Sequence, residues 1–141
     1  MKIHFSSIAV VGAGAMGQGI AQIATQAGSH VWLLDSKPGA ADKARQAIQQ
    51  QWAKLAAKGR VTEEQVQAWN QQLQIANTLA DLGPCQLVIE AVVERLEVKQ
   101  ALFAELERTL PANVVWATNT SSLSVTAIAA ALQQPERLAG F

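Results

Sequence analysis

The sequence predicts an α/β domain built on a doubly wound, mostly parallel sheet. Short apolar, β-branched runs alternate along the chain with segments whose apolar residues recur at helical spacing. The apolar runs are nearly continuous, as in strands that helices cover on both faces. The chain has 141 residues, of which 50% are hydrophobic, enough for one buried core and too few for two domains.

The first strand, helix and second strand are expected at the start of the chain. The apolar run at residues 8–11 stops at a glycine and favours a buried strand. Apolar residues recur at helical spacing over residues 16–27, and Gly28 is typical of a helix end. A second apolar run, residues 30–34, ends at Asp35 and predicts the second strand.

Two helices are expected next, as an αα-hairpin inserted after the second strand. The first covers residues 38–58, with Pro38 in its first turn and its apolar residues on one stripe. Thr62 with Gln65 three residues later forms a capping box, which predicts a second helix over residues 63–72.

The second half of the chain continues the alternation of strands and helices. A Leu-Gly-Pro turn at residues 82–84 precedes its strongest apolar run. The elements expected after the hairpin are a weak strand at 73–76, a strand at 86–92, a helix at 96–110, a strand at 114–117, a short helix at 125–132 and the opening of a strand at 138–141.

Charge and cysteine content exclude several classes of protein. The 11 basic and 11 acidic side chains balance, so the chain lacks the basic excess that would indicate a nucleic acid or an anionic membrane as a partner. One cysteine excludes a disulfide scaffold and a cysteine-rich metal site. Two stretches without charge, residues 4–34 and 109–135, are interrupted by glycine, proline and polar residues, and predict neither a membrane span nor a signal peptide. We expect a cytoplasmic protein.

A glycine-rich turn follows the first expected strand and opens the first expected helix. Residues 12–17 read Gly-Ala-Gly-Ala-Met-Gly, which is the G-x-G-x-x-G pattern, and Asp35 ends the next strand. Gly12 permits the tight turn, Gly14 lets a pyrophosphate approach the backbone, and Gly17 lets the helix pack closely on the strand. This context is typical of a Rossmann-type dinucleotide-binding fold.

The cofactor expected at this turn is NAD. The backbone N–H groups at Ala15 and Met16 and the dipole of the helix would hold the phosphates. The Asp35 carboxylate would accept hydrogen bonds from the adenosine ribose and repel a 2′-phosphate, which favours NAD over NADP. Lys37 is the nearby cation that would favour NADP, and a glycine-rich turn that only packs is the structural alternative.

Two polar segments in the second half carry a family resemblance. Residues 90–99 read Glu-Ala-Val-Val-Glu-Arg-Leu-Glu-Val-Lys, and residues 118–124 read Thr-Asn-Thr-Ser-Ser-Leu-Ser. With the glycine-rich turn and residues 135–141, they make essentially the whole chain resemble the 3-hydroxyacyl-CoA dehydrogenase family. Within it, the chain is most similar to bacterial 3-hydroxybutyryl-CoA and 3-hydroxyadipyl-CoA dehydrogenases, the latter of which serve phenylacetate breakdown.

The resemblance implies roles for five residues. Ser121 matches a catalytic-site serine whose hydroxyl contacts the 3-oxygen of the substrate. Glu94 and Lys99 match residues that line the NAD site near the nicotinamide half, and Lys54 and Lys58 match basic residues that contact CoA. The alternatives are a helix cap for the serine, surface charges for the first pair and a solvated helix face for the two lysines.

The resemblance also implies parts that residues 1–141 do not contain. In the family, the strand that matches residues 138–141 continues into an H-x-F-N-P motif, whose histidine is the general base and would directly follow Phe141. A helical second domain then supplies much of the acyl-CoA pocket and the dimer contacts. We therefore expect residues 1–141 to be a truncated NAD-binding domain, inactive alone. The full-length homodimer would interconvert (3S)-hydroxyacyl-CoA and 3-ketoacyl-CoA in β-oxidation.

Two other functions remain open from the sequence. One is a non-catalytic NAD-binding or redox-sensing module, against which the hydroxyl-rich segment 118–124 argues. The other is a different NAD-dependent hydroxy-acid dehydrogenase that shares only the glycine-rich turn.

Five other notable side chains are expected to be structural. His4 precedes the first strand, and His30 begins the second at the wrong end of the sheet for catalysis. Cys85 follows a turn and is expected to pack rather than react, and Trp52 and Trp69 are expected in the core of the hairpin.

Overall fold

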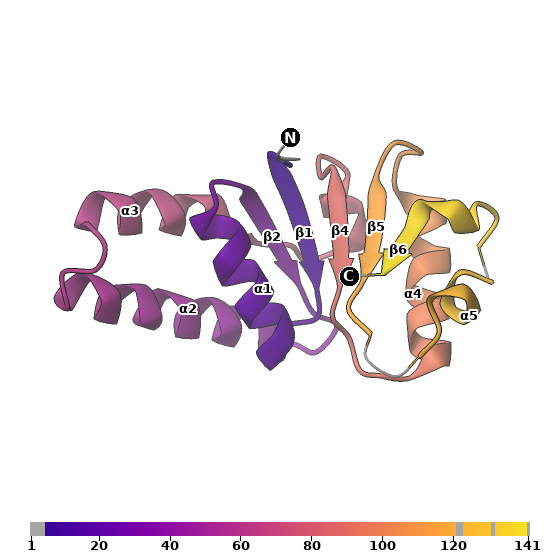
Figure 1. The fold of residues 1–141 in the computed structure, drawn as a ribbon, viewed down its shortest axis with the longest axis horizontal. Helices are drawn as coiled ribbons and strands as arrows, with labels where there is room; N and C mark the ends of the chain where they lie inside the picture. The colour runs from indigo at the N-terminus through magenta and orange to yellow at the C-terminus, as the bar shows by residue number, and fades with distance from the viewer. Residues whose placement is uncertain (1–4, 121–122, 131, 141) are drawn as a thin grey trace.

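The computed structural model describes residues 5–120, 123–130 and 132–140. These residues form one six-stranded sheet in the order β3-β2-β1-β4-β5-β6, with every neighbouring pair parallel (Figure 1). The strands are β1 (Ser7–Val11), β2 (His30–Leu34), β3 (Leu73–Ile75), β4 (Leu87–Glu90), β5 (Val115–Thr118) and β6 (Leu138–Gly140). The strand order reverses between β1 and β4, which confirms the doubly wound sheet.

Helices cover both faces of the sheet and bury a separate apolar core on each. The helices are α1 (Ala15–Gln26), α2 (Ala40–Ala57), α3 (Glu63–Gln72), α4 (Leu96–Thr109) and α5 (Val125–Ala129), with short 3-10 turns η1 (Leu79–Leu82) and η2 (Pro135–Arg137). One core lies under α1, α2 and α3, and the other lies under α4, α5 and η1. This two-sided burial explains why the strand sequences are apolar throughout.

The predicted αα-hairpin is confirmed as α2 and α3, which extend side by side away from the sheet (Figure 1). Trp52 and Trp69 are buried between the two helices, with ring centroids 5.5 Å apart. Thr62 and Gln65 form the predicted capping box. Pro38, however, lies before the helix, which begins after the N-cap Gly39.

Several expected boundaries in the second half differ from the structure by one residue, and the ends of the strand at 86–92 and of the helix at 125–132 differ by more. The fourth strand is shorter than its apolar run, because the chain leaves the sheet after Glu90 and its next residues line a cavity. The expected turn at residues 82–84 begins within η1, which includes Leu82 and starts at a capping box formed by Thr78 and Asp81. The last helix is shorter than expected and ends at Ala129.

The strand expected at residues 138–141 is present as β6, which pairs in parallel with β5. Leu138 lies opposite Trp116, and Gly140 lies opposite Thr118. Phe141, the last residue of the expected strand, lies outside the described residues. The expectation that a general-base histidine follows Phe141 therefore stays a prediction from the family resemblance.

Within the described part of the chain, no helix combines the length and the apolarity that crossing a bilayer requires. The same residues contain no group of three or more histidine, cysteine, aspartate or glutamate side chains placed to hold a metal ion.

Candidate cofactor site

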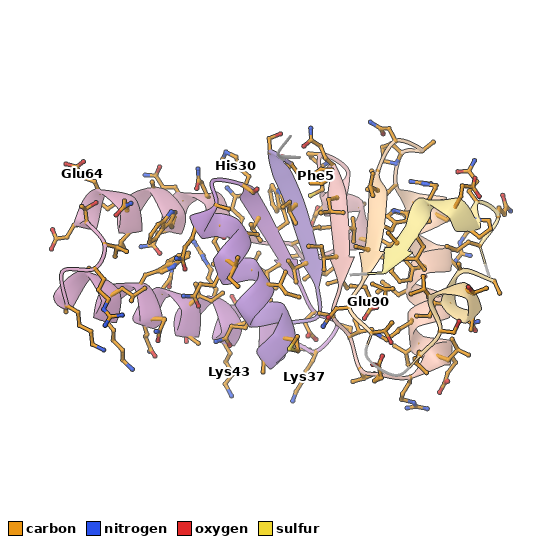
Figure 2. The ribbon with its side chains drawn as sticks, in the orientation of Figure 1. Phe5, His30, Lys37, Lys43, Glu64 and Glu90 are labelled. Atoms are coloured by element: carbon orange, nitrogen blue, oxygen red, sulfur yellow. The ribbon has the colours of Figure 1, made fainter. Side chains whose placement is uncertain are left out.

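A cavity of about 930 Å³ opens at the carboxyl ends of β1 to β4. Its position is the crevice at which strand order reverses, where α/β sheets bind their ligands. Figure 2 shows Lys37 and Glu90 toward this edge of the molecule, and His30 and Phe5 toward the opposite edge. The lining residues are Val11, Gly12, Gly14, Ala15, Met16, Leu34, Asp35, Ser36, Lys37, Asn77, Thr78, Leu79, Ala91, Val92, Val93, Val98 and Leu102.

The three glycines of the turn meet different surroundings. A Cβ on Gly12 would lie 2.3 Å from the Ala91 carbonyl oxygen, and one on Gly17 would lie 1.7 Å from the Gly12 carbonyl oxygen. At Gly14 nothing lies within 4 Å of the same position. Two glycines are therefore required by packing of the backbone itself, and Gly14 faces open space beside the cavity.

The N-terminus of α1 meets this open space without a side-chain cap. Gly14 is the N-cap residue, no described side chain caps the turn that follows, and that first turn holds no acidic residue. The first helical N–H groups, at Ala15 and Met16, border the cavity. Such groups, with the positive end of the helix dipole, form a ready anion site.

Asp35 lies at the end of β2 and joins that strand to the glycine-rich turn. Its Oδ2 accepts a hydrogen bond from the Ala13 backbone N–H at 2.7 Å, and its Oδ1 accepts one from the Lys37 N–H at 2.8 Å. Each carboxylate oxygen can accept more than one hydrogen bond, so both remain able to receive ribose hydroxyls. Asp35 thus has the position that the sequence predicted and also fixes the turn.

The loop after β3 forms one wall of the cavity, which the sequence analysis did not identify. Asn77, Thr78 and Leu79 line this wall. The Asp81 carboxylate accepts hydrogen bonds from the Asn77 and Thr78 backbone N–H groups, and these bonds hold the pKa of Asp81 below its usual value. The signal for this turn was the Thr-x-x-Asp spacing, which is a capping box.

A buried ionic cluster lies where β4 and β5 finish, and its charged side chains are not among those that line the cavity. Lys99 is fully buried, with its Nζ 2.6 Å from Glu90 Oε2 and 3.3 Å from Glu94 Oε1. The Thr120 hydroxyl donates to Glu94 at 2.7 Å, and the Glu94 side chain is 33% exposed. The surface-charge alternative is therefore wrong for Lys99.

Sequence reasoning missed Glu90 and Thr118 as members of this cluster. Both side chains are fully buried, and the Thr118 hydroxyl donates a hydrogen bond to Glu90 Oε1. The available signal was a glutamate at the end of an apolar strand, because a buried carboxylate requires a cation or several donors.

The expected catalytic serine, Ser121, lies outside the described residues, as Phe141 does. Its alternative role was that of a helix cap. The N-cap of α5 is Ser124, whose hydroxyl accepts a hydrogen bond from the Ala127 N–H, so the cap of that helix is already assigned. The catalytic role of Ser121 stays a prediction.

The two lysines expected to contact CoA lie apart from the cavity. Lys54 and Lys58 are exposed in the last turn and at the C-cap of α2. That end of α2 is the one farther from the sheet in Figure 1. The structure therefore does not bring these lysines together with the cofactor site.

Cys85 and His30 have the structural positions that were expected. The thiol of Cys85 is buried, and removal from solvent raises its pKa to about 12, which leaves no thiolate nucleophile at neutral pH. His30 begins β2, at the amino edge of the sheet, and is exposed.

The doubly wound sheet, the uncapped glycine-rich turn and Asp35 at the end of β2 define a dinucleotide-binding domain of the Rossmann type. The family model of the 3-hydroxyacyl-CoA dehydrogenase NAD-binding domain matches residues 7–141. The chain belongs to this family and is an NAD-binding domain of it.

Individual relatives agree with the family match. The chain is 41% identical over its whole length to a 3-hydroxyadipyl-CoA dehydrogenase of Escherichia coli, of which it covers 30%. It is 38% identical over 99% of its length to a probable 3-hydroxybutyryl-CoA dehydrogenase of Bacillus subtilis, of which it covers 48%. A crystal structure of an Escherichia coli 3-hydroxybutyryl-CoA dehydrogenase superposes with a TM-score of 0.93 at 40% identity, covering 98% of this chain and 29% of that one. The chain thus spans less than half of each.

Proposed function

We propose that the cavity binds NAD in an extended pose across the point where strand order reverses. The adenosine would lie toward β2 and β3, the pyrophosphate at the N-terminus of α1, and the nicotinamide toward the ends of β4 and β5. The observation that carries this proposal is the open space at Gly14, beside uncapped N–H groups and within a cavity that Asp35 also lines. Because Gly14 has no side chain, a phosphate can approach the backbone at this position.

We also propose that Asp35 selects NAD over NADP. Its two oxygens receive backbone N–H groups and keep capacity for the ribose hydroxyls. A 2′-phosphate would bring negative charge against this carboxylate. Lys37 lines the same cavity, but its backbone rather than its ammonium contacts Asp35.

In the intact enzyme, we propose that this domain supports the interconversion of (3S)-hydroxyacyl-CoA and 3-ketoacyl-CoA. The bound cofactor supplies the acceptor for the hydride that leaves C3 of the hydroxyacyl group. Ser121 would donate a hydrogen bond to the substrate 3-oxygen as it changes between hydroxyl and carbonyl. The substrates are those of 3-hydroxybutyryl-CoA or 3-hydroxyadipyl-CoA dehydrogenases, as in the relatives.

Removal of the proton from the substrate hydroxyl requires a general base. We propose that this base is a histidine that follows Phe141 in the intact enzyme. Residues 1–141 include two histidines. His30, the one that the structure describes, lies at the opposite edge of the sheet from the cavity. Without that base, residues 1–141 would bind NAD and not turn over. We further propose that the intact enzyme is a cytoplasmic homodimer in which Lys54 and Lys58 contact the phosphates of CoA.

The test compares residues 1–141 with a chimera that joins them to the C-terminal half of the Bacillus subtilis relative, the part that this chain does not match. Acetoacetyl-CoA-dependent oxidation of NADH is followed by absorbance. We expect the printed chain to bind NADH without turnover, and the chimera to turn over. Ser121→Ala in the chimera should lower the rate by about 10²-fold, the typical cost of a lost donor at such a site.

Each outcome bears on a different part of the proposal. Robust turnover by the printed chain alone would overturn the external base. Failure of the printed chain to bind NADH at millimolar concentration would overturn the cofactor site. NADH binding by the chimera with no oxidation in the presence of acetoacetyl-CoA would favour a non-catalytic NAD-binding module.

A further inference from the structure

Glu90, the last residue of β4, carries a fully buried carboxylate. Its neighbours Ala91 and Val92 line the cavity, whereas Glu90 is not among the lining residues. Figure 2 shows it at the end of its strand, on the β4 side of the glycine-rich turn. Any effect of Glu90 on a bound cofactor must therefore pass through the groups that its carboxylate holds.

The Glu90 carboxylate joins three segments of the chain. Its Oε2 accepts a hydrogen bond from the Val92 backbone N–H at 2.7 Å and one from Lys99 Nζ at 2.6 Å. Its Oε1 accepts a hydrogen bond from the Thr118 hydroxyl at the end of β5. One buried side chain thus fixes the chain leaving β4, the first turn of α4 and the end of β5 relative to one another.

Through the Val92 hydrogen bond, Glu90 fixes the part of the cavity wall that Ala91 and Val92 form. The carbonyl of Ala91, which precedes the fixed Val92 N–H, approaches Gly12 so closely that a Cβ there would lie 2.3 Å away. Lys99 Nζ in turn lies 3.3 Å from Glu94 Oε1 and donates to the Asn119 carbonyl at 3.4 Å. The partly exposed Glu94 carboxylate, which also accepts a hydrogen bond from Thr120, thus contacts an ammonium that Glu90 anchors.

A buried ion pair of this kind is a poor source of stability, because taking both charges out of water offsets most of their attraction. What it provides is a fixed geometry, since a charge without its partner cannot remain in that environment. We propose that Glu90 is a positioning residue for the nicotinamide half of the cofactor. This inference rests on the proposed pose of NAD.

The test measures two ligands against one substitution. ADP-ribose contains the adenosine and the pyrophosphate of NADH and lacks the nicotinamide. For Glu90→Gln we expect the Kd for NADH to rise about tenfold or more, the effect of one lost charge-assisted contact, and the Kd for ADP-ribose to change less than about twofold. Glu97→Gln is the matched control, because Glu97 is exposed and its carboxylate pairs with the exposed Arg95 rather than with the buried cluster.

A second variant guards against a failure of Glu90→Gln to fold. Thr118→Val removes one hydrogen-bond donor to Glu90 and preserves both charges and the shape of the side chain. It should weaken NADH in the same selective manner, by about threefold to tenfold, the range for one neutral donor. If Glu90→Gln does not fold, the test is the ratio of the Kd for NADH to the Kd for ADP-ribose in Thr118→Val, compared with the same ratio in the unsubstituted chain.

The outcomes separate this inference from the proposed function. A selective loss of NADH affinity supports the positioning role. Equal loss of both ligands overturns it and assigns Glu90 a structural role only, and so does an unchanged affinity for both. If the unsubstituted chain binds neither ligand, the proposed cofactor site fails first and the inference fails with it.

Discussion

At the scale of single residues, the glycine-rich turn contains one glycine that folding requires, Gly17, and one that we expect cofactor binding to require, Gly14. Gly17→Ala would place a methyl group 1.7 Å from the Gly12 carbonyl oxygen, so the backbone must move, at a cost of about 1–3 kcal/mol or more in the free energy of unfolding. Gly14→Ala meets no atom within 4 Å and should cost less than about 1 kcal/mol. Its methyl group would occupy the proposed pyrophosphate position, and NADH affinity should fall at least about tenfold.

Urea unfolding and NADH titration of both variants check this contrast. Gly17→Ala measures packing of the helix on the turn, and Gly14→Ala measures access of a phosphate. A Gly14→Ala protein that binds NADH as tightly as the parent would contradict the proposed pose.

Asp35 carries the prediction about cofactor choice. Asp35→Asn removes the charge and one acceptor while it retains the size of the side chain. We expect the Kd for NADH to rise about tenfold, and the ratio of NADH to NADPH affinity to fall, because the repulsion of a 2′-phosphate is lost. Asp42→Asn, an exposed position in the first turn of α2, is the control and should change neither affinity. An unchanged preference in Asp35→Asn would rule out this carboxylate as the selector.

Cys85 carries a prediction about pH. Burial raises the pKa of its thiol from 9.0 to about 12, so between those values the folded chain keeps a proton that the unfolded chain has lost. The free energy of unfolding should therefore fall as pH rises through this interval. A Cys85→Ala variant, compared with the parent by urea unfolding at pH 8 and pH 11, should show a smaller decrease. An equal decrease in both proteins would show that this thiol does not contribute.

At the scale of elements, most of the fold could be predicted from residue patterns. The capping box at Thr62 gave the start of α3, and β2 lies where its apolar run predicted. The boundaries that differed depend on tertiary contacts. β4 ends at Glu90, whose side chain accepts a hydrogen bond from the Val92 backbone N–H. The start of η1 depends on the Asp81 carboxylate that caps it. Neither contact follows from apolar periodicity.

The hairpin of α2 and α3 carries the prediction about substrate. Lys54 and Lys58 are four residues apart and exposed, so they lie on one helix face. In the catalytically competent chimera, Lys54→Gln with Lys58→Gln should raise the KM for acetoacetyl-CoA by about tenfold or less, as expected for exposed ionic contacts, with little change in the KM for NADH. Lys43→Gln, an exposed lysine near the start of the same helix, is the control. An unchanged KM in the double variant would leave these lysines as a solvated face.

At the scale of the whole molecule, the edge of the sheet that holds the site was predictable, because the carboxyl ends of parallel strands carry ligands at a reversal of strand order. The glycine-rich turn and Asp35 meet there as expected. The cluster around Glu90 was not predicted, because its members come from β4, α4 and β5 and only the fold unites them. Sequence spacing within one element can identify a turn or a cap, but it does not identify such a cluster.

In the proposed pose, this edge of the sheet binds NAD with its adenosine ribose on Asp35. The most direct measurement is the equilibrium binding of NADH and NADPH to the unsubstituted chain, followed by energy transfer from its tryptophans, of which it has four. The proposed pose predicts saturable NADH binding and NADPH binding at least about tenfold weaker, from the charge of Asp35 alone. Equal or tighter binding of NADPH, or no binding of NADH at millimolar concentration, would contradict it.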